Sequence, residues 1–188
     1  MPDQFWRQPL VVSQVDGPTL TAAAAASCIP ATDRITLPNN FFDILGKKLW
    51  IKASGRISCA VTTPGTARFD LRLGTAGTIV VFDTGALNLN IVAKTTVPWD
   101  LEIELTLRAR GITTAANLFG QGKFSSEAVI GAPLPSAGGN GVLLAPVGTP
   151  AVGAGFDSSV ANVLDMFFTQ TVATGSLTVH QYIVESSN

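Results

Sequence analysis

A strict alternation of apolar and polar residues is the clearest pattern in the chain. Between residues 99 and 110, apolar side chains occupy every second position, at Leu101, Ile103, Leu105, Leu107 and Ala109. A period of two is that of a β-strand with one face on a core and the other face in solvent. At about 3.3 Å per residue the predicted strand extends roughly 40 Å, a length that suits a sandwich of two sheets.

Further segments with strand patterns lie on both sides of this one. They are residues 49–53, 56–61, 68–73, 78–82, 163–171 and 176–184, with one more strand within residues 117–130. The glycine-containing segment 74–77 predicts the turn of a hairpin, and residues 172–175 predict the turn of a second, final hairpin. Ser54 and Gly55 predict a turn between the first two segments.

Helical patterns are nearly absent. Residues 38–46 predict no more than one or two helical turns, with Gly46 at their end. No segment keeps the 3.6-residue period of the crossover helices that a parallel sheet needs. We therefore predict an all-β fold, an antiparallel β-sandwich arranged as a single jelly roll.

Two segments fall outside the predicted sandwich. We expect residues 1–30 to form an extended N-terminal arm and residues 31–188 to form one domain, from which the Gly/Pro/Ala-rich residues 131–155 project as a long loop. A loop of this length is unusual unless it is functional or docked on something, and the alternatives are a plain surface excursion or an extra edge strand at residues 142–147. Large apolar side chains in both segments are the candidate interface residues: Phe5, Trp6, Leu134, Val142, Leu143 and Leu144.

The most unusual feature of the composition is the scarcity of charged residues. Charged residues make up 13% of the chain, against roughly 25% in an average domain, and the mean hydropathy is +0.35. Prolines interrupt the uncharged stretch 128–156, so it predicts no membrane helix, and the first residues show no secretory signal. A chain this poor in charge is predicted to bury part of its surface against copies of itself or another protein.

The net charge bears on nucleic-acid binding, and the two cysteines bear on metal binding and disulfide formation. The net charge is −1 and the twelve basic residues are scattered, so we predict no direct contact with nucleic acid. Cys28 and Cys59 lack the spacing of metal ligands. We interpret them as buried thiols, with a disulfide as the alternative.

Candidate catalytic groups are few. His180 is the only histidine, no nucleophile motif accompanies it, and we interpret it as a structural residue that shares a strand face with Thr178 and Tyr182. Glu102 and Glu104 have a spacing near that of glycosidase carboxylates. Because arginines continue the same strand face at positions 108 and 110, a cross-strand paired surface is the favoured interpretation.

Two other patterns also receive structural interpretations. The segment Gly120-Gln-Gly122-Lys123 lacks the rest of a phosphate-binding loop, so its glycines predict a bulge or bend in a strand. Trp6, Trp50 and Trp99 suggest a sugar-stacking platform, but the strand contexts of Trp50 and Trp99 predict core burial. We therefore expect no catalytic residue, no metal and no cofactor.

Two blocks resemble structural proteins of tailed bacteriophages. One is Leu37-Pro-Asn-Asn-Phe-Phe with Gly46-Lys-Lys-Leu-Trp-Ile-Lys-Ala-Ser-Gly-Arg-Ile-Ser, and the other is Asp165-Met-Phe-Phe-Thr-Gln-Thr with Gly175-Ser-Leu-Thr-Val-His-Gln-Tyr-Ile-Val-Glu. The resemblance covers about residues 35–130 and 160–186. It implies a jelly-roll virion protein of the capsid decoration or cement type, made in the host cytoplasm, which sits as a homotrimer on the capsid surface and binds the major capsid protein. It supplies no catalytic residue.

Two alternatives remain open from the sequence. The first is a tail or fibre-head β-sandwich that binds a host glycan or receptor, because phage head and tail proteins share such folds. The second is an enzyme such as a glycan depolymerase, which the lack of a convincing acid–base pair disfavours.

Overall fold

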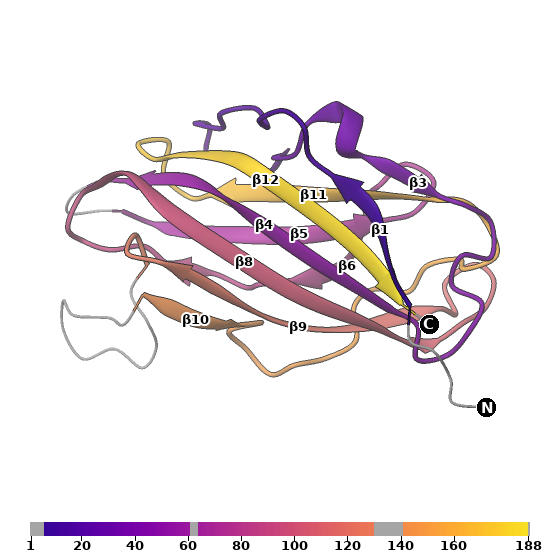
Figure 1. Cartoon of the computed structure of the whole chain (residues 1–188). Coiled ribbons are helices and arrows are strands. Elements are labelled where there is room, and N and C mark those ends of the chain that lie inside the picture. The colour runs from indigo at the N-terminus through magenta and orange to yellow at the C-terminus, as the bar shows by residue number, and fades with distance from the viewer. Residues whose placement is uncertain (1–5, 61–63, 130–140, 188) are drawn as a thin grey trace.

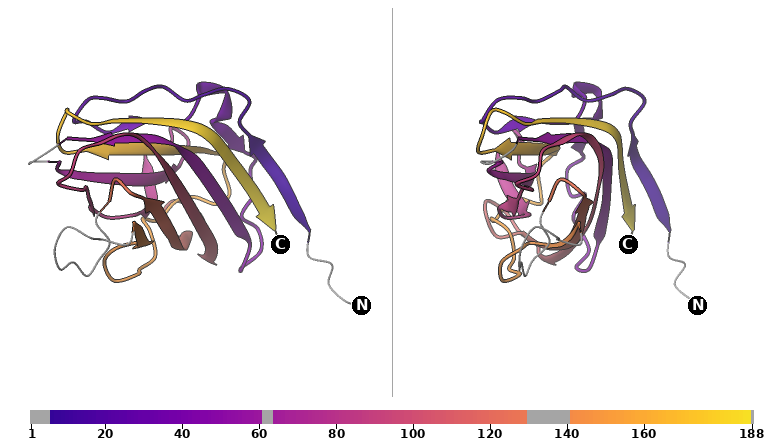
Figure 2. Two further views of the ribbon diagram at one scale, coloured as in Figure 1. Left: turned by 60° about the vertical axis from the view of Figure 1, so that its left-hand side comes forward. Right: turned by 90° about the vertical axis from the view of Figure 1, so that its left-hand side faces the viewer.

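Two antiparallel β-sheets lie face to face in the computed structural model, which describes residues 6–60, 64–129 and 141–187 (Figures 1 and 2). The first sheet has the order β1 (Arg7–Val12), β12 (Ser176–Ser187), β4 (Lys48–Cys59), β8 (Lys94–Ala109), β9 (Asn117–Ser126) and β10 (Val142–Ala145). The second sheet has the order β2 (Ala26–Ser27), β11 (Asn162–Gln170), β5 (Thr66–Leu73) and β6 (Ile79–Asp83). In addition, β3 (Ile35–Leu37) pairs with β11, and β7 (Leu87–Asn88) pairs with β5.

The order of the strands is that of a jelly roll. Pairs nest inside one another along the chain: β1 pairs with β12, β2 and β3 pair with β11, β4 pairs with β8, and β5 pairs with β6. A long antiparallel hairpin that is rolled up so that its arms alternate between two sheets gives this pattern. Strands β9 and β10 extend the first sheet beyond β8. The predicted antiparallel all-β sandwich is therefore confirmed.

The core lies between the sheets and follows the alternation seen in the sequence. In β8 the side chains of Leu101, Ile103, Leu105 and Leu107 are buried, and those between them reach the outer surface. Phe69 of β5 lies at the centre of an aromatic cluster, with its ring centroid 5.2 to 5.4 Å from those of Trp99, Phe124 and Phe168. These rings join the two sheets across the middle of the sandwich.

The turn predicted at Ser54 and Gly55 is wrong, because β4 runs without interruption from Lys48 to Cys59. Gly55 lies opposite a bulge in β12, where the register shifts between Val179 and Gln181. A Cβ atom at Gly55 would come within 2.0 Å of the carbonyl oxygen of Thr178. The glycine therefore permits a close approach of two strands, and it does not mark a turn.

The predicted hairpins have different outcomes. The hairpin at residues 74–77 is confirmed, because β5 pairs with β6 and Gly77 donates a hydrogen bond to the carbonyl of Gly74. The final hairpin is wrong, because β11 and β12 belong to different sheets and the connection between them crosses the sandwich.

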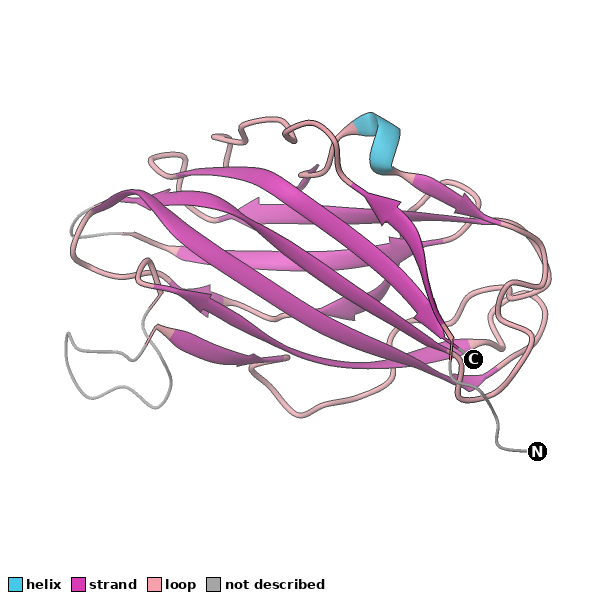
Figure 3. Ribbon diagram, in the orientation of Figure 1, coloured by secondary structure: helices cyan, strands magenta, loops and turns pink. Residues whose placement is uncertain are grey.

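Helical structure is confined to a single turn in the part of the chain that the structure describes. The predicted turns at residues 38–46 are not helical, and the one short 3-10 helix lies at Ala31–Asp33 (Figure 3). No helix among the described residues is long and apolar enough to cross a bilayer.

The two segments expected outside the sandwich contribute strands to it. Residues 7–12 form the edge strand β1 and are not an arm; the strand tolerates Pro9 because it is an edge strand, with a register shift between Pro9 and Val11. Residues 142–145 form the opposite edge strand, β10, which pairs with β9 and confirms the alternative of an extra edge strand. Phe5 and Leu134 lie outside the described residues.

Candidate functional site

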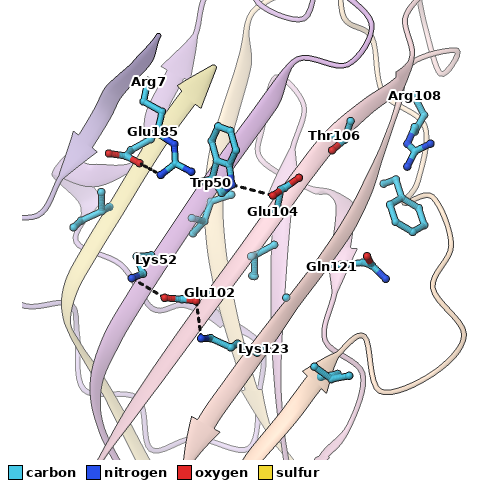
Figure 4. A pocket seen from close by; sticks show the side chains of 16 residues that line it. Arg7, Trp50, Lys52, Glu102, Glu104, Thr106, Arg108, Gln121, Lys123 and Glu185 are labelled. Carbon is cyan, nitrogen blue, oxygen red and sulfur yellow. Dashed lines mark hydrogen bonds and ion pairs between the residues drawn. The ribbon is translucent and has the colours of Figure 1, made fainter. Parts of the chain in front are cut away.

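A pocket of about 710 Å³ opens on the outer face of the first sheet (Figure 4). Its walls come from all six strands of that sheet, because the outward side chains of neighbouring strands stand in rows across it. The same alternation that buries one face of β4, β8 and β9 directs the polar side chains of these strands into the pocket. The pocket divides into a half whose charges are paired and a half whose polar groups are unengaged.

One row of the paired half joins three charged residues. Lys52, Glu102 and Lys123 lie opposite one another on β4, β8 and β9. The Nζ atoms of Lys52 and Lys123 lie 2.6 and 3.0 Å from the two carboxylate oxygens of Glu102. The hydrogen bond from Lys52, followed by that from Lys123, lowers the pKa of Glu102. The same contact with Glu102 raises the pKa of Lys52.

A second row is built around Trp50. Its indole nitrogen donates a 3.0 Å hydrogen bond to Oε2 of Glu104, and Lys48 contacts the other carboxylate oxygen at 2.5 Å. The guanidinium of Arg7 lies 4.1 Å from the centroid of the Trp50 ring and also pairs with Glu185 at 3.4 Å. The hydrogen bond from Lys48, together with that from Trp50, lowers the pKa of Glu104.

The prediction that Trp50 is a core residue is therefore wrong, whereas Trp99 is buried as predicted. Leu49 and Ile51 point into the core on either side of Trp50, so the alternation of β4 places the indole on the outer face. The prediction followed the aromatic character of Trp50, whereas its position in the alternation of the strand decides that it faces outward.

The other half of the pocket carries side chains with no partner. Among the described residues, the side chains of Thr106, Arg108 and Gln121 make no hydrogen bond or ion pair. The guanidinium of Arg108 lies 4.9 Å from the ring centroid of Phe119, which is the cross-strand partner of Thr106. Leu144 of β10 lies opposite Lys123 and therefore borders the paired half.

The paired rows decide how Glu102 and Glu104 can act. A general acid at neutral pH needs a carboxyl group with a raised pKa, and here lysine contacts lower the pKa of both groups. Both carboxylates are also held in fixed contacts on the outer face. The arrangement is the cross-strand paired face that the sequence predicted.

The remaining candidates for chemistry have structural surroundings. Nδ1 of His180 lies 3.0 Å from the carboxylate of Asp16, on the surface. The bulge in β12 changes the direction of the side chains, so Tyr182 is buried in the core and does not share a face with His180, which corrects the prediction. No group of three or more potential metal ligands occurs in residues 6–60, 64–129 and 141–187. Both cysteines are buried free thiols, as predicted, and form no disulfide.

The glycines of the segment 120–122 do not mark a bulge. The pairing of β8 and β9 stays in register through both, and it shifts only between Leu107 and Ala109. A Cβ atom at Gly120 would lie 2.3 Å from the ring of Phe82, and one at Gly122 would lie 2.2 Å from the carbonyl oxygen of Glu102. Both glycines therefore serve close packing.

The candidate interface residues fall into two groups. Trp6, Val142 and Leu144 are exposed, at 72%, 40% and 75%. Leu143 is only 4% exposed because it lies opposite Phe124 on the inner face of β10, so it belongs to the core of its own chain and its assignment to an interface is corrected.

Sequence reasoning missed a further group of exposed apolar residues. Ile44, Leu45 and Ile112 are each at least half exposed and lie in loops at one end of the first sheet. We call these three and Trp6 the end patch, and we call Val142 and Leu144 the edge patch. Loop residues follow no period, so only their apolar character within turn segments could have identified them.

Comparisons with protein-family models, with curated proteins and with solved structures give no match.

Proposed function

We propose that the chain is a structural subunit of a bacteriophage particle, of the capsid cement type, which forms trimers and binds the major capsid protein. The observation that carries the proposal is the end patch on a chain with 13% charged residues. Exposed apolar groups that lie together on a surface are typical of protein–protein contacts. The resemblance of two sequence blocks to phage structural proteins supports the choice of particle.

The members of the end patch are held at one end of the sheet. Gly46 donates a 3.0 Å hydrogen bond to the carbonyl of Leu107, and Arg110 donates one of 2.6 Å to the carbonyl of Asp43. These bonds fix the loop of Ile44 and Leu45 against the turn that contains Ile112. Trp6 precedes β1, whose first residue lies in register with the last residues of β12 and thus at the same end of the sheet.

A cement function requires each subunit to hold more than one neighbour. The edge patch lies on β10, which forms one edge of the first sheet, and the end patch lies where β1, β4 and β8 begin or end. Two separate apolar surfaces allow one subunit to contact two neighbours at once. Burial of each large apolar side chain contributes about 1.5–3 kcal/mol, and repeated modest contacts sum to a large stabilisation of a shell.

Particle association tests this function. We would purify particles from the source that encodes the chain and label them with gold-conjugated antibody raised against the purified chain. Label on the particle heads is expected, and Leu144→Asp should reduce incorporation severalfold, while Val92→Asp, at an exposed position outside both patches, should not. A chain that stays in the soluble fraction and never accompanies particles would contradict the proposal.

A second candidate function is a tail or fibre-head module that binds a host glycan or receptor. The observation that favours it is the unengaged half of the pocket, where polar and aromatic side chains converge without partners in the described chain. Label at the tail tip in place of the head would favour this candidate.

A further inference from the structure

One cation in the lining of the pocket has no carboxylate partner in the described chain. Four cationic side chains face three carboxylates across the lining: Arg7, Lys52, Arg108 and Lys123 against Glu102, Glu104 and Glu185. Each carboxylate has a cationic partner, since Glu185 pairs with Arg7, Glu104 with Lys48, and Glu102 with two lysines. Arg108 makes no ion pair or hydrogen bond among the described residues, and its guanidinium lies over the ring of Phe119.

The groups around Arg108 indicate what it would bind. Thr106 and Gln121 supply a hydroxyl and an amide, each able to donate and to accept, and neither is engaged within the described chain. The ring of Phe119, which lies opposite Thr106, supplies an apolar face beside them. These are the groups that a small, hydroxyl-rich ligand with one negative charge requires.

We propose that this half of the pocket binds an acidic saccharide, a sugar that carries a carboxylate. The planar guanidinium of Arg108 would accept the carboxylate as a two-pronged partner. The amide of Gln121 and the hydroxyl of Thr106 would bind the ring hydroxyls, and a C–H face of the sugar would lie against Phe119. The inference deepens the second candidate function and does not depend on the cement role.

Other charged ligands fit the pocket less well. A nucleic acid needs several unmatched cations along its phosphates, and the pocket offers one, beside three carboxylates. An extended peptide is most often held by main-chain bonds at a sheet edge, whereas Thr106, Arg108 and Gln121 stand on the faces of β8 and β9, which both have neighbours on each side. An acidic peptide is therefore an outcome to test and not the proposed ligand.

The experiment begins with the whole chain on an array of carboxylated and neutral glycans. Carboxylated members, such as sialyllactose and trigalacturonate, should retain the chain, while lactose and the methyl ester of trigalacturonate should not. In titration calorimetry with the best-bound acidic glycan, Arg108→Gln should weaken affinity about tenfold or more, because a hydrogen-bonded ion pair is lost. Arg108→Lys should recover only part of the loss, since the charge returns without the two-pronged geometry.

Arg56 provides the matched control. It is an exposed arginine on β4 that has no carboxylate partner within the described residues and does not line the pocket. Arg56→Gln should leave affinity unchanged, and thermal unfolding of each variant checks its fold. Absence of binding to any carboxylated glycan, equal binding of the methyl ester, displacement by a polyglutamate peptide at equal strength, or full affinity in Arg108→Gln would each overturn the proposal. A trimer that fails these binding tests leaves the cement role standing.

Discussion

The indole nitrogen of Trp50 donates a 3.0 Å hydrogen bond to Oε2 of Glu104, and the two residues face each other in the register of β4 and β8. Lys48 contacts the second oxygen of the same carboxylate. Glu104 thus interacts with β4 in three ways: through the strand pairing, through the indole of Trp50 and through the ammonium group of Lys48. These contacts hold the side chains of Trp50 and Glu104 in place in the paired half of the pocket.

This contact predicts a pH dependence of stability. The fold lowers the pKa of Glu104 from its ordinary value of 4.5, so the ionised carboxylate stabilises the folded state. That stability is fully present above the ordinary pKa and is lost as the pH falls through the lowered, folded pKa. Glu104→Gln should therefore be less stable than wild type near neutral pH, by about 1 kcal/mol or less for such an exposed pair.

Urea unfolding of both proteins between about pH 3 and pH 7 measures the difference. The two unfolding free energies should converge at the acid end, where the wild-type carboxyl is protonated. A gap of constant size across this range would show that the ionisation of Glu104 makes no contribution.

The aromatic cluster around Phe69 should be the most sensitive part of the core. The Phe69 ring touches Trp99 and Phe124 of the first sheet and Phe168 of the second. Phe69→Ala leaves a cavity between the sheets and should cost about 3–5 kcal/mol, whereas Phe69→Leu should cost less. Chemical denaturation measures both, and an alanine variant within 1 kcal/mol of wild type, roughly, would argue against this cluster as the centre of the core.

Gly153 should resist substitution. A Cβ atom there would lie 1.9 Å from the carbonyl oxygen of Val81, and the Gly153 amide donates a hydrogen bond to Leu118. Gly153→Ala should therefore destabilise the fold by about 1–3 kcal/mol through overpacking against backbone. Gly148→Ala is the control, because among the described residues no heavy atom outside its chain neighbours lies within 4 Å of the added methyl group. Equal thermal stability of the two variants would refute the close approach.

The Cys28 thiol should be inert in the native protein. Burial raises the pKa of Cys28 well above its ordinary value, and the neighbouring Asp165 carboxylate adds to the shift. Only the thiolate reacts with Ellman's reagent, so Cys59→Ser should give no reaction in native buffer and one thiol per chain in urea. Rapid native reaction of Cys28 would mean that the sheets open readily at this point.

The sequence predicted best those features that depend on local alternation. The period of two placed the core residues of β8 and the hairpin between β5 and β6. The alternation also allowed a strand at Val142–Ala145. The apolar character of Leu143 suggested contact with another protein, but Leu143 lies opposite Phe124 of the same chain. Local patterns cannot distinguish these two, because a side chain buried by its own fold and one buried by a neighbour look alike.

The features that sequence could not predict depend on distant strands. The bulge in β12 shifts the alternation after Val179, which is why Tyr182, and not Gln181, is the next residue in the core. Gly55 predicted a turn because its actual role, the close approach to Thr178 more than a hundred positions away, leaves no local pattern. The unengaged cluster around Arg108 emerges only when β8 and β9 are set in register, since Phe119 and Thr106 become neighbours there.

Light scattering coupled to size-exclusion chromatography measures the solution mass of the purified chain and so tests whether the chain forms the proposed trimer. We predict three times the chain mass of 19.5 kDa for wild type. The end-patch variant Leu45→Asp/Ile112→Asp should elute as a folded monomer, while Ile91→Asp, in a loop at the other end of the sandwich, should remain a trimer. A wild-type chain of 19.5 kDa at every concentration, with the end patch in water, would contradict the account.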